Sequence, residues 1–143
     1  MILTEQQARA LLNEGFTCVL YGENETYKST ERGVAPLIQW LQSGSNFHGF
    51  AAVDKVVGKA AAFLYVLLGV DKVYAVLISD SAEKVLKEYG IPYTYETKVS
   101  AIRNRTGDGF CPMEQAVLDI AEPNVAYARI QETLQKLKKQ EIQ

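Results

Sequence analysis

The sequence predicts an α/β protein: a three-layer α/β/α arrangement around a mixed sheet. Two β-rich segments, residues 16–21 and 26–30, flank a turn containing Gly22 and indicate a hairpin. Residues 73–78 form a continuous apolar run, which is typical of a strand covered on both faces. Segments with helical spacing alternate with the later strands, so the expected order is α-β-β-α-β-α-β-α-β-α-α with helices on both faces.

The elements of the first half follow from capping and periodicity. The run Thr4-Glu5-Gln6-Gln7 is a capping box that begins a helix, and Gly15 ends that helix. After the hairpin, apolar residues at helical spacing predict a helix over residues 34–41. Residues 50–53 read as a buried strand.

In the second half, residues 56–68 are apolar on nearly every face and predict a helix ended by Gly69. A short helix runs from Asp80 to Gly90, and residues 93–97 form a polar strand typical of a sheet edge. A loop over residues 99–109 leads to a helix at 112–121, and Pro123 separates that helix from the last one.

Composition limits the classes of function. The 143 residues predict a single domain, 1–143, with a C-terminal helical extension over about residues 111–140. The net charge of −2 does not favour a nucleic-acid partner, and the longest apolar run, residues 60–70, is too short to span a membrane. Cys18 and Cys111 without a secretory signal indicate free thiols and a cytoplasmic location.

Asp54 and Lys55 are the first candidate site residues, because charge where a strand meets a helix is how open α/β sheets build pockets. Lys55 would bind an anionic group and Asp54 would orient a ligand or act as an acid/base, unless Asp54 only caps the helix and Lys55 is solvated. Lys59 faces either the pocket or solvent. Gly58-Lys59 is not a P-loop, because Val53 and Ala60 stand where that motif needs Gly and Ser or Thr.

The second candidate segment is residues 103–114. Cys111 precedes Pro112 at a helix start, where a thiolate is favoured; with Glu114 as acid/base it would be a nucleophile, unless it is an inert core thiol. Arg103, Arg105 and Asp108 either form part of a phosphate-binding arch or belong to a polar surface loop. The carboxylates Asp54, Asp108 and Glu114 would suit Mg²⁺ only if folding made them converge, so we assign no metal and no cofactor.

The segments 54–62 and 109–114, together with the element order, resemble domain-of-unknown-function family 1893, a branch of the cytidine-deaminase-like superfamily. The resemblance covers almost the whole chain and implies a deaminase-like fold without naming a reaction. Zinc deaminases carry H-x-E and P-C-x-x-C at two helix starts. Here Arg32-Gly33-Val34-Ala35 and Asp54-Lys55-Val56-Val57 offer no zinc ligand, and the soft ligands Cys18, His48 and Cys111 would have to converge from distant places.

Three functions remain. The first is a binding or regulatory module that takes a small anionic or nucleotide-like ligand through Lys55, Lys59, Arg103 and Arg105. The second is a metal-independent enzyme with Cys111 as nucleophile, and the third is a zinc deaminase with rearranged ligands. The apolar helix at residues 56–68 also predicts a homodimer, because an exposed face of that size would be unfavourable in water.

Overall fold

This computed structural model describes residues 3–103, 109 and 111–142. Its elements are α1 (Glu5–Leu12), β1 (Cys18–Tyr21), β2 (Thr26–Ser29), α2 (Ala35–Gln42), β3 (Ala51–Val57), α3 (Lys59–Leu68), β4 (Lys72–Ser79), α4 (Asp80–Glu88), β5 (Tyr93–Val99), α5 (Pro112–Ala116) and α6 (Pro123–Ile142). This is the order that the sequence predicts. The capping box of α1 is confirmed: Thr4 and Gln7 bond each other's backbone N–H groups.

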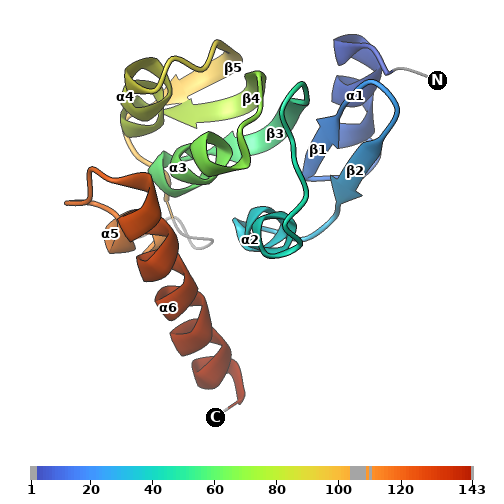
Figure 1. Cartoon of the computed structure of the whole chain (residues 1–143). Coiled ribbons are helices and arrows are strands. Elements are labelled where there is room, and N and C mark those ends of the chain that lie inside the picture. Colours follow the sequence, from blue (N-terminus) through green and yellow to red (C-terminus); the bar gives the residue numbers. More distant parts are fainter. Residues whose placement is uncertain (1–2, 104–108, 110, 143) are drawn as a thin grey trace.

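The strands form one mixed sheet in the order β2-β1-β3-β4-β5 (Figure 1). Strand β1 is antiparallel to both β2 and β3, whereas β3, β4 and β5 run parallel to one another. The β1–β3 register places Cys18 directly opposite Asp54. The carboxyl ends of three parallel strands therefore meet at one edge of the sheet and their amino ends at the other.

The two faces of this sheet are covered unequally. Residues of α2 through α6 pack into one large apolar cluster on the first face. On the second face, α1 is the one helix of the described residues, and it packs on β1 and β3. Helices do lie on both faces, as predicted, but the second layer is a single short helix that leaves β4 and β5 mostly uncovered there.

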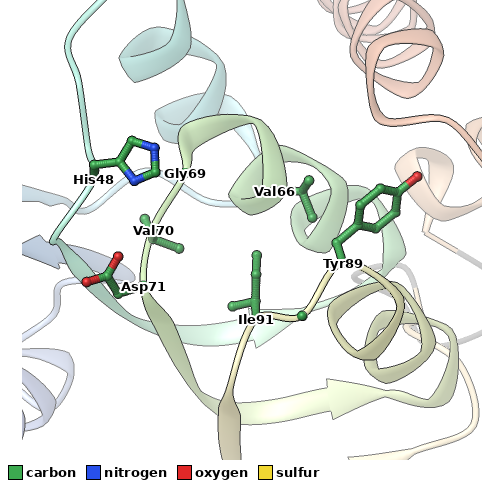
Figure 2. A pocket seen from close by; sticks show the side chains of 8 residues that line it. His48, Val66, Gly69, Val70, Asp71, Tyr89 and Ile91 are labelled. Carbon is green, nitrogen blue, oxygen red and sulfur yellow. The ribbon is translucent and has the colours of Figure 1, made fainter.

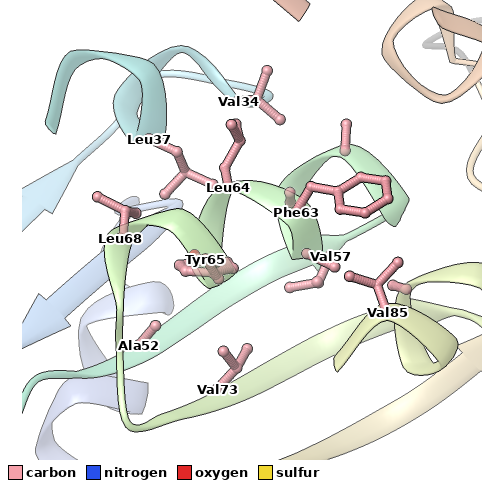
Figure 3. Packing of buried hydrophobic residues seen from close by; sticks show 14 of the residues in the cluster. Val34, Leu37, Ala52, Val57, Phe63, Leu64, Tyr65, Leu68, Val73 and Val85 are labelled. Carbon is pink, nitrogen blue, oxygen red and sulfur yellow. The ribbon is translucent and has the colours of Figure 1, made fainter. Parts of the chain in front are cut away.

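Helix α3 is the centre of the larger cluster. Phe63, Leu64 and Tyr65 are at most 1 % exposed. Figure 3 shows these side chains enclosed between the sheet, α2 and α4. The apolar surface of α3 is thus covered within one protomer, which removes the reason for the predicted homodimer; the dimer itself stays a prediction.

The boundary between β3 and α3 differs from the predicted one. We expected a strand over residues 50–53 and a helix from residue 56, with Asp54 as a possible cap. The strand instead continues to Val57 and the helix is capped by Gly58, so the reading of Asp54 as a helix cap is wrong. A buried carboxylate inside a strand needs tertiary hydrogen-bond donors, and these are invisible in the local sequence.

No helix in the described ranges has both the length and the apolar character required to cross a membrane.

Candidate functional site

Asp54 belongs to a buried polar cluster with two other side chains. The Tyr65 hydroxyl donates to Asp54 Oδ2 over 2.6 Å, and Cys18 Sγ lies 3.0 Å from the same hydroxyl oxygen. The Val56 N–H donates to Asp54 Oδ1 over 3.2 Å. Cys18, Asp54 and Tyr65 come from β1, β3 and α3, and each is at least nine-tenths buried.

Burial controls the proton affinities in this cluster. It raises the pKa of Asp54 to about 6, although the hydrogen bonds from Tyr65 and Val56 oppose the shift. Burial also raises the pKa of Cys18 and of Tyr65 well above their ordinary values, and the Asp54 charge adds to both shifts. Cys18 is therefore a protonated thiol next to the Tyr65 hydroxyl, and it lacks the thiolate character of a nucleophile.

Glu114 closes the N-terminus of α3. Its two carboxylate oxygens accept the backbone N–H groups of Lys59, at 2.7 Å, and Ala60, at 3.0 Å. A Cβ at Gly58 would lie 2.5 Å from the carboxylate carbon, so any other residue there would displace the Glu114 carboxylate. The two candidate segments do meet, but the donors expected to bind a ligand anion already hold an internal carboxylate, which the positive end of α3 favours.

The candidate lysines are not gathered at this contact. Lys59 Nζ donates to the carbonyl of Leu118 over 2.9 Å, which ties α3 to the segment after α5. Lys55 is exposed, although it directly follows the buried Asp54 in β3. Cys111 packs on the α3 side of the sheet. The shared pocket with Lys55 and Cys111 therefore stays a prediction.

Cys111 is half-buried at the start of α5, a helix of only five residues, and its backbone N–H donates to the Ile102 carbonyl. Arg103 is exposed. Arg105 and Asp108 lie outside the described residues, and with them part of the predicted phosphate arch and Mg²⁺ set. Among the described residues, no three His, Cys, Asp or Glu side chains are placed to hold a metal ion, so Cys18, His48 and Cys111 do not converge.

An open cavity of about 320 Å³ lies at the opposite edge of the sheet, near the amino ends of β4 and β5 (Figure 2). Val66, Val70 and Ile91 form its apolar part, with His48 and Asp71 on one side and Tyr89 on the other. The Asp71 carboxylate also accepts the Gly49 N–H over 3.2 Å. The Tyr89 hydroxyl donates to the Ala121 carbonyl over 3.2 Å. We call this the amino-edge pocket.

Two helices end at this pocket. Gly69 terminates α3 and Gly90 follows the end of α4, both with positive φ, and both glycines line the cavity. Helix C-termini carry partial negative charge, and Asp71 adds a full negative charge. The sequence indicates both glycines as helix ends. No local pattern shows that parallel strands bring those ends together, or marks Asp71 and Tyr89 as lining a pocket.

The comparisons with known proteins agree on one family. The model for the domain of unknown function DUF1893 (TM1506) matches residues 6–134. The crystal structure of a DUF1893 family protein, TM1506 from Thermotoga maritima, is similar over 94% of this chain and 92% of that one, with 27% identity and a TM-score of 0.80. No curated protein matches. This chain therefore belongs to the DUF1893 family.

Proposed function

We propose that this chain is a small-molecule-binding module with a cytidine-deaminase-like fold, and that the amino-edge pocket is its binding site for an organic cation. The leading helix, the β-hairpin and the alternation of helices with parallel strands support the deaminase-like assignment. The observation that carries the binding site is the convergence of two helix C-termini and Asp71 on one partly apolar cavity.

Zinc-dependent deamination is not part of this proposal, because the residues at the helix starts do not suit it. Helix α2 begins after Arg32-Gly33-Val34, and α3 begins at Gly58-Lys59-Ala60, so neither start offers a soft ligand. The first turn of α3 is bound by Glu114 instead.

The cationic ligand replaces the anionic or nucleotide-like ligand expected from the sequence. Of the groups assigned to an anion, the α3 amides hold Glu114 and Lys59 holds a backbone carbonyl. The amino-edge pocket has the opposite polarity. A ligand with a primary ammonium and a compact apolar body matches the acceptors of Asp71 and the helix ends together with Val66, Val70 and Ile91.

The test is binding of benzylamine, with neutral benzyl alcohol as the matched probe, followed by backbone amide shifts in NMR spectra. We expect benzylamine to shift Gly69, Val70 and Gly90 and to bind about tenfold more tightly than the alcohol, since a hydrogen bond to a charged group contributes about 1.5–3 kcal/mol. Asp71→Asn keeps an acceptor for Gly49 but removes the charge, and it should abolish this preference. The exposed Asp119→Asn is the control. Equal binding of both probes, or shifts elsewhere, would refute the proposal.

The enzyme with a Cys111 nucleophile receives no support of its own from the geometry. Glu114, its expected acid/base, has both oxygens engaged by α3. Its other expected partner, Asp54, is bound by Tyr65 within the core.

A further inference from the structure

A second cavity lies on the sparsely covered face of the sheet, where α1 leaves β4 and β5 open. Its volume is about 400 Å³, and it is lined by α1 residues on one side and by strand residues on the other. Its polar lining consists of Gln6, Arg9, Asn13, Tyr74 and Glu96. We call it the open-face pocket. It shares no lining residue with the amino-edge pocket.

Arg9 lies over the ring of Tyr74 at the side of this pocket. Its guanidinium carbon lies 4.0 Å from the centroid of the Tyr74 ring. A cation over an aromatic ring is attracted by the negative face of that ring, and the planar fork of a guanidinium matches the two oxygens of a carboxylate. The ion pair with Glu5 is long, at 3.8 Å, and both side chains are well exposed, so it competes only weakly.

Glu96 supplies the opposite charge next to the same tyrosine. Burial raises the pKa of Tyr74, the Glu96 carboxylate raises it further, and Arg9 opposes the shift. Both charged groups are therefore near the Tyr74 hydroxyl, one from the helix and one from the edge strand. The pocket is therefore lined by one cationic and one anionic side chain, and not by charges of a single sign.

The remaining lining provides space and adaptable hydrogen bonding for a side chain. Gln6 lies in α1 and Asn13 caps the C-terminus of that helix, seven residues further on, so both lie on the same side of α1 as Arg9. Leu12 and Val76 contribute apolar surface. Amide groups donate and accept, so the pocket suits either a polar or an aliphatic ligand body.

We propose that the open-face pocket binds a zwitterionic small molecule, a free α-amino acid, with its carboxylate on Arg9 and its ammonium on Glu96. This goes beyond the proposed function, because it concerns other residues on the other face of the sheet. In this arrangement each charge of the ligand meets an opposite charge, and the ligand's side chain lies toward the amides of α1.

The experiment uses L-leucine and two derivatives that each lack one charge, N-acetyl-L-leucine and L-leucinamide, with L-glutamine as a polar zwitterion. Binding is followed by amide shifts at Arg9, Tyr74 and Glu96 in the full chain. We expect both zwitterions to bind, and each single-charge derivative to bind about tenfold more weakly or worse. Equal binding of all four probes, or no binding at about 10 mM, would overturn the proposal.

Two variants identify the groups that carry the charge recognition. Arg9→Gln should weaken binding of L-leucine at least about tenfold but leave binding of the already weak L-leucinamide nearly unchanged. Glu96→Gln should likewise weaken binding of L-leucine but leave binding of the already weak N-acetyl-L-leucine nearly unchanged. Arg32→Gln and Glu23→Gln, at exposed positions outside both pockets, are the matched controls. Thermal unfolding of each variant establishes that it is folded. If a folded Arg9→Gln protein loses affinity for all probes equally, the pairing of charges is wrong.

Discussion

The two faces of the sheet use their polar groups in different ways. On the face covered by α2 to α6, two carboxylates are hydrogen-bonded within the protein. Asp54 accepts from Tyr65, and Glu114 accepts from the first turn of α3. On the other face, where α1 is the one helix within the described part of the chain, Arg9 and Glu96 line an open cavity. The difference shows that polar groups at the carboxyl ends of the strands, a position that usually marks a ligand site in α/β proteins, here contact other groups of the fold.

Gly58→Ala tests this comparison with the largest expected effect. The added methyl group displaces the Glu114 carboxylate and leaves two N–H groups of α3 without it, so we expect unfolding to become easier by about 3–5 kcal/mol. Urea unfolding measures the change. Because the two residues act as a unit, Glu114→Ala should cost much less when combined with Gly58→Ala than alone. Additive costs would mean that the contact does not hold the two segments together.

The pH dependence of stability tests the buried carboxylate. The pKa of Asp54 is raised from 3.8 to about 6 in the folded protein, so the folded state holds this proton more tightly than the unfolded state. Its contribution therefore falls as pH rises from about 4 to about 6, by roughly 3 kcal/mol in total, and is constant above that window. Asp54→Asn should flatten this part of the urea-unfolding profile, whereas Asp119→Asn should keep it. An unchanged slope in Asp54→Asn would remove Asp54 as the cause.

The two thiols should differ in reactivity. Cys18 is almost fully buried with a raised pKa, whereas Cys111 is only half-buried. Treatment of the folded protein with iodoacetamide should therefore add a single group, at Cys111, and unfolding in urea should add the second. Intact-mass and peptide analysis distinguish the sites. Rapid labelling of Cys18 in the folded state would show that the reagent reaches the core between the sheet and α3.

The smallest effects are expected on the open face. Arg9→Gln and Glu96→Gln should each change the free energy of unfolding by only about 0.5 kcal/mol or less, since Arg9 makes a long, exposed ion pair with Glu5 and lies over the ring of Tyr74. Thermal and urea unfolding measure this. A loss of several kcal/mol in either variant would mean that these charges also serve the fold, and the contrast between the two faces would disappear.

Much of the site could not be predicted from the sequence, for identifiable reasons. The sequence indicated that the segments around residues 58 and 114 approach each other, and they do. It did not indicate that Glu114 would turn its carboxylate onto α3, because Gly58 shows its role only when a side chain from 56 positions away fills the space above it. Asp54 and Lys55 looked like a polar strand end, but the strand continues because Tyr65 supplies a donor within the core.

The amino-acid sequence alone determined the order of helices and strands, the capping box of α1 and the glycine stops of α3 and α4, because periodicity, caps and turns depend on neighbouring residues. Only the tertiary structure decided which polar groups are hydrogen-bonded within the protein and which line a cavity. The reason is that parallel strands bring distant helix ends together at one edge of the sheet, and that among the residues described α1 is the one helix on the second face.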